Sequence, residues 1–250
     1  MSGRDSPIPW ALAIETSNPS SHDDAPAAGV AGRRLESDAV ADRGPGEIVE
    51  IPLAPGARHD DGLMPAIEAL RARLGVGPGD LERVCVSIGP GGYTGLRVAV
   101  TTAKSIAETT GAAVVGVPSA AVAAANSGLE PPFAVCLASK RGATHVTVFK
   151  GCTSAEPGTI STLLGVEVGL IDAEGLEPLG VRFLIADRFL PDGIRRRAAQ
   201  LGIGVQPPRF TAVACLELGL CLDQEPIEKL APAYARVPEA VRLWKVRHQA

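Results

Sequence analysis

The chain has 250 residues, a length that suits one large domain or two small ones. Hydrophobic residues make up 46% of it and charged residues 21%, which excludes global disorder. The formal net charge of −4, without a long basic run, argues against an extensive nucleic-acid surface.

From the N-terminus, short strands are expected over 10–16, 28–31 and 47–53. A helix is expected over 62–74, because Leu63, Ile67, Leu70 and Leu74 recur at helical spacing. Pro65 fits this helix if it lies in the first turn, where backbone amides have no intrahelical acceptor.

The clearest unit comes next. A β-branched strand at 84–88, a glycine-rich turn, a helix at 94–108 and a strand at 113–117 predict a right-handed parallel βαβ unit. A short helix at 119–125 leads into a loop at 126–132 that is rich in glycine and proline. We therefore expect two domains, residues 1–125 and 126–250.

The second half contains strand patterns at 133–138, 145–149, 166–171 and 181–186, and a helix at 212–222. The order of three strands followed by mixed α/β structure thus occurs twice, which predicts a structural duplication. The densest basic patch, Arg195 to Arg197, is interpreted as a solvated helix face.

The five cysteines form no C-x-x-C pair and lie mostly in apolar stretches, which predicts buried free thiols in a reducing compartment. No apolar run approaches the ~18 residues that cross a bilayer. Residues 1–9 lack the apolar core of a signal peptide. We expect a cytoplasmic protein with no membrane partner.

The glycine-rich turn, Gly89-Pro90-Gly91-Gly92, lies between a strand and a helix N-terminus. Two interpretations are open. Free amides and the helix dipole favour a bound phosphate or carboxylate, whereas small residues are also what a tight turn needs. The turn is not a Walker A loop, because no G-K-[ST] follows it.

The longer segment resembles the Gly-Pro-Gly-Ser-Phe-Thr-Gly-Leu-Arg signature of the TsaB (YeaZ) family. The matching residues are Gly89, Pro90, Gly91, Gly92, Tyr93, Thr94, Gly95, Leu96 and Arg97, and all of them except Leu96 also mark the possible anion site. Ala13 to Ser17, Leu63 to Pro65, Val115 to Ser119 and Pro232 to Arg236 resemble further family segments in the same order. The resemblance covers residues 10–125 and returns at 232–240, but it is thin over 133–230.

The resemblance implies an α/β, two-domain actin-like ATPase fold, as in acetate and sugar kinases, heat-shock chaperones and actin. Each domain would be a mixed sheet with flanking helices, the second one divergent. It also implies a non-catalytic scaffold or activator in the synthesis of threonylcarbamoyladenosine at position 37 of tRNA. The partners would be a TsaD-like catalytic subunit and a TsaE-like ATPase, with tRNA contacted only through the complex.

Contact with the TsaD-like subunit, or with a second copy in a homodimer, would use helices 62–74 and 94–108. The interface candidates are Leu63, Ile67, Thr101, Thr102, Lys104 and Ser105. The resemblance implies no cofactor of its own, although ATP or ADP could be shared at the partner interface.

Several departures from the family pattern bear on catalysis. Glu15 replaces the family's opening aspartate, so Glu15, Thr16 and Ser17 could form a vestigial nucleotide site. A strand-end carboxylate is also a common hydrogen-bond partner for a turn. The loop at 17–27 is longer than the phosphate hairpin of an active actin-like ATPase, which argues against ATP hydrolysis.

In the second half, the family's Asp-Ala-Arg-x-Gly-Glu-Val-Tyr becomes Ala138 to His145, without the Asp and Glu. The four histidines lie far apart with no H-x-x-x-H pair, so we expect no metal site. No catalytic nucleophile can be named. The alternative function is a stand-alone small-molecule kinase or ATPase of the actin-like fold.

Overall fold

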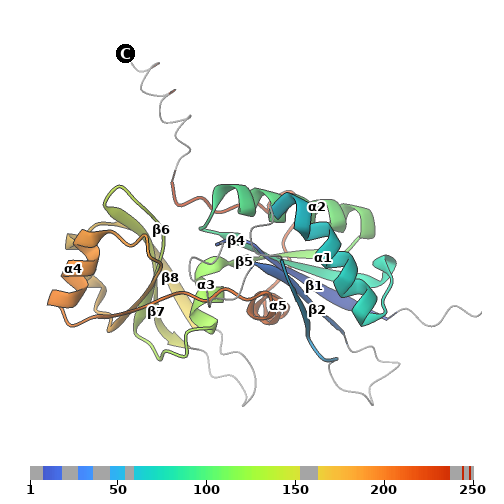
Figure 1. The fold of residues 1–250 in the computed structure, drawn as a ribbon, viewed down its shortest axis with the longest axis horizontal. Coiled ribbons are helices and arrows are strands. Elements are labelled where there is room, and N and C mark those ends of the chain that lie inside the picture. The colour runs from blue at the N-terminus through green and yellow to red at the C-terminus, as the bar shows by residue number, and fades with distance from the viewer. Residues whose placement is uncertain are drawn as a thin grey trace, which may run out of the picture.

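The computed structural model describes residues 8–18, 28–35, 46–53, 59–152 and 163–236, together with residues 244 and 248. Two five-stranded sheets, A and B, lie side by side with helices between and outside them (Figure 1). Sheet A contains β1 (Trp10–Glu15), β2 (Gly29–Arg34), β3 (Val49–Pro52), β4 (Leu81–Gly89) and β5 (Ala113–Pro118). Sheet B contains β6 (Phe133–Lys140), β7 (Ala143–Cys152), β8 (Leu163–Ile171), β9 (Phe183–Ala186) and β10 (Gly204–Gln206).

The helices are α1 (His59–Leu74), α2 (Tyr93–Thr110), α3 (Ser119–Ala125), α4 (Asp192–Gln200) and α5 (Ala212–Cys221), with 3₁₀ turns η2 (Pro78–Asp80) and η3 (Glu174–Leu179). Within the described ranges, no helix is both long and apolar enough to cross a membrane.

The two sheets share one topology. Sheet A has the order β3-β2-β1-β4-β5, and sheet B has the order β8-β7-β6-β9-β10 when read from its other edge. In each, the first three strands pair antiparallel, and the first strand also pairs parallel with the fourth, which pairs parallel with the fifth. The predicted duplication is therefore confirmed at the level of strand order and direction.

Sheet A is covered on both faces. Successive side chains of a strand point to opposite faces. Leu12 and Ile14 of β1 accordingly pack with α1 and α2, whereas Ala11 and Ala13 pack with α3 and α5. Burial on both faces explains why β1 reads as an unbroken apolar run rather than as an alternating one.

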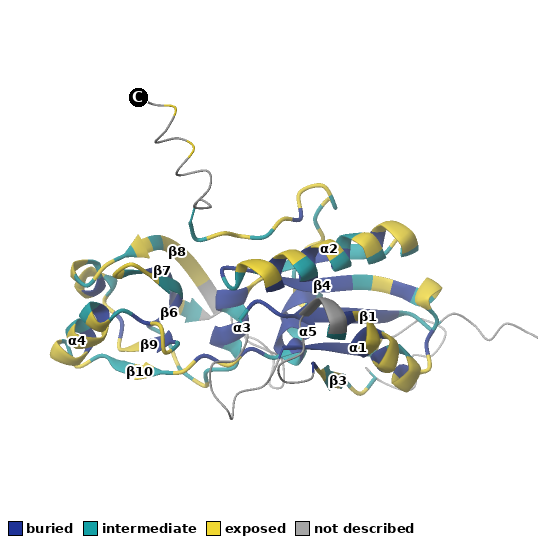
Figure 2. Cartoon of the chain, turned by 45° about the horizontal axis from the view of Figure 1, so that its top comes forward, coloured by how far each residue is buried: buried dark blue, intermediate teal, exposed yellow. Residues whose placement is uncertain are grey.

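One core joins the two sheets. Phe133, Val135 and Leu137 of β6 pack into the same cluster as α3 and α5, while Ala134 and Cys136 face α4 and η3. Helices α3 and α5 therefore form a buried layer between the sheets, and α4 lies on the outer side of sheet B (Figure 2).

After sheet B the chain returns to sheet A. Helix α5 contacts β1, β2, β4 and β5. A Cβ added at Gly219 would lie 2.4 Å from Cys85 Sγ, so this glycine lets α5 approach β4 closely. The boundary predicted after residue 125 separates the strands of the two sheets, but α5 packs on the sheet of the first half.

All strands and helices predicted from the sequence are present, with ends that differ by a few residues. Helix α4 and strand β10 were not predicted. Only Ile194 and Ala198 of α4 are buried, so its apolar period is weak, and β10 has three residues. Arg195 and Arg196 are exposed on α4, as the basic patch predicted.

Helix α1 begins at His59, three residues before the predicted start. Pro65 therefore lies in the second turn, and the first-turn explanation for it is wrong. Its missing N–H leaves the carbonyl four residues earlier without an intrahelical donor.

Candidate functional site

The glycine-rich turn at the end of β4 is shaped by two other segments of the protein. Gly89 has φ +109°, and a Cβ there would lie 2.6 Å from the Ala233 carbonyl oxygen. A Cβ at Gly91 would lie 2.1 Å from the Ser17 carbonyl oxygen. The Gly92 N–H donates to that same oxygen at 2.6 Å. Close backbone approach within the chain thus accounts for these glycines.

Helix α2 starts directly after this turn. Gly92 is its N-cap, without a side-chain capping bond, and its carbonyl accepts the first helical hydrogen bond from Leu96 N–H at 3.0 Å. Because the Gly92 N–H already donates to the Ser17 carbonyl oxygen, one of the donors that an anion would use is occupied. Anion binding by this turn stays a prediction.

The possible vestigial nucleotide site is buried. Glu15, Thr16 and Ser17 are each at most 1% exposed. The Ser17 N–H donates to Glu15 Oε1 at 2.7 Å, and Thr16 Oγ1 donates to the Gly95 carbonyl at 3.0 Å. Glu15 therefore acts as a turn partner, and the three residues tie β1 to α2.

The second oxygen of Glu15 has an unusual environment. Glu15 Oε2 is buried and accepts no hydrogen bond from the described residues. Burial raises the pKa of this carboxyl, while hydrogen bonds from Ser17 and Ser87 partly oppose that rise. Its proton is therefore held more tightly than in water.

The surroundings of Glu15 are polar but not nucleophilic. Ser87 Oγ and Ser119 Oγ lie 2.8 Å apart, and Cys215 Sγ lies 3.9 Å from the Ile14 carbonyl. Burial, followed by the nearby Glu15 charge, raises the pKa of the Cys215 thiol well above its usual value. A buried thiol that keeps its proton is a poor nucleophile.

The predicted partner helices show which residues can meet a partner. Leu63 and Ile67 are 1% and 8% exposed and pack into the core of sheet A, so their assignment to the interface is wrong. Their helical spacing marks the face of α1 that the sheet covers. Thr101 and Ser105 of α2 are exposed; Thr102 and Lys104 are half-buried.

An exposed stripe runs along α2 at intervals of four residues through Tyr93, Arg97, Thr101 and Ser105. Arg97 Nη1 donates to Tyr93 Oη at 3.0 Å. The Tyr93 ring stacks on Tyr234, with ring centroids 5.2 Å apart. The sequence singled out both segments by resemblance, but it did not predict that they touch.

Residues 232–236 link the two sheets. The Ala233 N–H donates to the Ile88 carbonyl of β4 at 2.7 Å. Arg236 Nη2 donates to the carbonyls of Lys140 and Ala143, at the turn between β6 and β7, at 2.8 and 3.0 Å. This segment therefore ties the glycine-rich turn of sheet A to sheet B.

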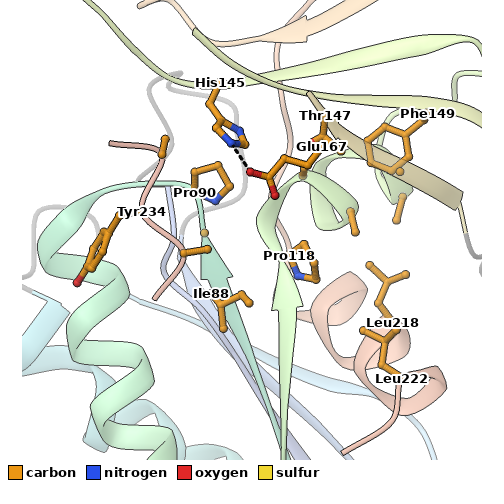
Figure 3. A pocket seen from close by; sticks show the side chains of 17 residues that line it. Ile88, Pro90, Pro118, His145, Thr147, Phe149, Glu167, Leu218, Leu222 and Tyr234 are labelled. Carbon is orange, nitrogen blue, oxygen red and sulfur yellow. Dashed lines mark hydrogen bonds and ion pairs between the residues drawn. The ribbon is translucent and has the colours of Figure 1, made fainter. Parts of the chain in front are cut away.

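A cavity of about 410 Å³ lies between the sheets, beside this segment (Figure 3). Its apolar walls include Ile88, Pro118, Ala121, Phe149, Leu218 and Leu222. His145 of β7 and Glu167 of β8 project from sheet B, with His145 Nε2 2.9 Å from Glu167 Oε1. Sequence reasoning missed Glu167, because an isolated glutamate in a strand carries no pattern.

Metal ligation finds no support in the described part of the chain, where no three His, Cys, Asp or Glu side chains come together. The N-terminal loop at 19–27 lies outside the described residues.

Three comparisons with known proteins bear on this arrangement. Residues 50–167 match the family model described as TsaD, tRNA N6-adenosine threonylcarbamoyltransferase. The tRNA threonylcarbamoyladenosine biosynthesis protein TsaB of Bacillus subtilis (strain 168) is 38% identical over 68 residues. That match spans 27% of this chain and only 30% of the length of TsaB.

Two solved structures share the fold. YeaZ from Pseudomonas aeruginosa superposes with a TM-score of 0.66 at 18% identity, covering 91% of this chain and all of that one. A protein described as similar to the peptidase YeaZ, from the same organism, gives 0.67 at 18% identity over 92% of this chain and all of its own. These comparisons confirm the resemblance to the TsaB (YeaZ) family and the α/β fold with two mixed sheets.

Proposed function

We propose that this chain, whose sequence and fold resemble TsaB (YeaZ), is a non-catalytic scaffold or activator subunit in the synthesis of threonylcarbamoyladenosine on tRNA. The observation that carries the proposal is that a TsaB-like sequence match occurs on a YeaZ-like fold. The family-model match at 50–167 includes α1, α2 and the glycine-rich turn, so it covers the proposed contact surface.

A binding role is supported over a catalytic one by the state of the segments that resemble the TsaB (YeaZ) family. The side chains of Glu15, Thr16 and Ser17 make internal contacts instead of facing solvent. The Cys215 thiol near Glu15 is buried, and its pKa is raised. We further propose that the duplicated topology is that of the actin-like ATPase superfamily, with the nucleotide chemistry lost.

The proposed partner surface is the outer side of α1 and α2. Exposed Met64, Pro65 and Ala69 of α1 supply apolar area, and Tyr93 and Arg97 of α2 are residue types that are enriched at binding hot spots. We propose that a TsaD-like catalytic subunit binds here, joined by a TsaE-like ATPase. In its absence a second copy of this chain would use the same helices.

The direct test is co-purification from the native cell, with depletion of this protein as the functional measurement. We expect a TsaD-like subunit to co-purify and the level of modified tRNA to fall on depletion. Modified tRNA at its full level after depletion would rule out the proposed role.

A charge placed on α2 tests the surface. Thr101→Glu puts an unpaired charge in the interface, which should weaken partner binding by about 2 kcal/mol or more, roughly thirtyfold in Kd. Because Thr101 is exposed, the melting temperature should stay the same. Ala199→Glu, an exposed site on α4, is the matched control. Equal loss of affinity in both variants would place the interface elsewhere.

The stand-alone ATPase or kinase makes the opposite prediction. It requires the isolated chain to bind ATP and to turn it over with Mg²⁺ in a manner that depends on Glu15. A flat calorimetric titration with ATP is expected under our proposal. Nucleotide that binds only in the complex would instead be shared across the partner interface. We also place the protein in the cytoplasm, where the free, buried thiols Cys85, Cys136 and Cys215 would stay reduced.

A further inference from the structure

We propose that the cavity between the two sheets is a binding site for a small cationic molecule with an apolar body, and that Glu167 selects the charge of this ligand. This inference is independent of the proposed role in tRNA modification, because it concerns the cavity and not the outer faces of α1 and α2. It follows from three properties of the walls: size, composition and charge.

The cavity has the dimensions of a small-molecule site. Its volume of about 410 Å³ falls within the roughly 300–1,000 Å³ of typical ligand pockets. Its walls come from both halves of the chain, with Ile88 and Pro118 from sheet A, Phe149 from sheet B and Leu218 from α5. Segment 233–235 closes one side, and the hydrogen bonds of Ala233 and Arg236 hold that segment in place.

The lining of the cavity favours an apolar group. Proline, alanine, leucine and phenylalanine side chains form most of it and offer few hydrogen-bonding partners. Phe149 is 1% exposed and Leu218 is 7% exposed, so both are held in fixed positions by the core behind them. A rigid wall of this kind loses little conformational entropy when a ring packs against it.

With His145 neutral, the formal charge of the described lining is −1. Of the described residues that line it, Glu167 is the one acid, and none is a lysine or an arginine. The Glu167 side chain is 73% exposed and points into the opening, whereas the His145 ring that holds Oε1 is 8% exposed (Figure 3). The buried imidazole orients the carboxylate, and the carboxylate faces the space where a ligand would lie.

This arrangement disfavours a nucleotide. Phosphates bind to lysine, arginine, a metal ion or free backbone amides. Arg236, which follows the lining residue Ala235, donates from Nη2 to the carbonyls of Lys140 and Ala143. A carboxylate whose basic neighbour in the described wall is a neutral imidazole repels a phosphate and attracts an ammonium group.

Tryptamine is a suitable probe, because it joins a flat indole ring to an ammonium group. Indole and indole-3-acetate keep the ring and change the charge to zero and to −1. Titrations of ¹⁵N-labelled protein would be followed at the backbone amides of Ala121, Thr147 and Leu218. We expect tryptamine to shift these amides and to bind about tenfold more tightly than indole-3-acetate.

Two variants separate charge selection from shape. Glu167→Gln should weaken the binding of tryptamine about fivefold, the upper end for a solvent-exposed ion pair, and leave the affinity for indole unchanged. Ala121→Leu fills the cavity from α3 and should weaken all three probes. Glu82→Gln, an exposed strand glutamate away from the cavity, is the matched control and should change nothing.

Three results would overturn the proposal. They are no tryptamine shift at the cavity amides, indole-3-acetate binding as tightly as tryptamine, and ATP shifting the same amides more strongly than tryptamine. Since Glu167 is exposed, the Glu167→Gln variant should fold normally, so the charge test stands even if Ala121→Leu destabilises the fold.

Discussion

The close contact between Gly91 and Ser17 allows the glycine-rich turn to be tested directly. In Gly91→Ala, the new Cβ would lie 2.1 Å from the Ser17 carbonyl oxygen, whereas ordinary contact begins at 3.4 Å. The two backbone segments would have to separate by roughly 1 Å or more, with the strain of an overpacked core. That movement also breaks the 2.6 Å hydrogen bond from Gly92 N–H to Ser17.

The expected magnitude follows from these two losses. Overpacking costs about 1–3 kcal/mol and a lost buried hydrogen bond costs about 1 kcal/mol more, so we expect a destabilisation of about 2–4 kcal/mol. For a chain of this size that corresponds to a fall of about 4–16 °C in melting temperature. Differential scanning fluorimetry and urea unfolding measure the two quantities.

Gly79→Ala is the matched control. Gly79 has no neighbour within 4 Å of an added Cβ, so this change should stay within about ±0.5 kcal/mol. Wild-type stability of Gly91→Ala would show that the backbones at Gly91 and Ser17 separate without a cost in folding free energy. If that stable variant also lost partner or anion binding, the glycine would be required for a ligand and not for contact with Ser17.

Three further predictions concern buried groups. Burial raises the pKa of Glu15, so the contribution of this carboxyl to the free energy of unfolding is fully present below the unfolded pKa and is lost as pH rises through the folded pKa. Glu15→Gln should therefore flatten the decline in stability above pH 4.5. An unchanged pH profile would contradict this. Of the four cysteines whose side chains the structure describes, only Cys221 is exposed, and the pKa values of Cys85 and Cys136 are raised to about 12 by burial. A thiol reagent should therefore label Cys221 in the folded protein, and Cys221→Ser should remove that labelling; rapid reaction at Cys85 would count against the structure. Gly219→Ala should destabilise the folded protein by about 1–3 kcal/mol, despite alanine's higher helix propensity, because the new Cβ would lie 2.4 Å from Cys85 Sγ. A higher melting temperature would show that α5 can move away from β4.

Local patterns were sufficient to predict most of the fold. The period of Leu63, Ile67, Leu70 and Leu74 identified α1, and the strand, turn and helix around Gly89 identified the βαβ unit, because these signals depend on residues close in sequence. The same signal misled us about the interface. Apolar spacing marks the side that the sheet buries, so Leu63 and Ile67 had to be core residues.

The contacts around the candidate site required the tertiary structure. Ser17, Gly91 and Ala233 are distant in sequence, and no local rule indicates that their backbones meet. Glu167 could be identified as a cavity residue only from the pairing of β8 with β7, which places its carboxylate beside His145. The pKa of Glu15 likewise depends on burial by segments that fold over it.

By itself, the sequence determined the order of the strands and helices other than α4 and β10, the duplication and the family resemblance, which rest on periodicity and on short motifs. Only the tertiary structure decided that the glycine-rich turn packs against the backbones of Ser17 and Ala233 and that a cavity lies between the sheets. The physical reason is the distance along the chain over which each effect acts. Helix and strand preferences act over a few residues, whereas desolvation and close packing depend on every segment that comes near.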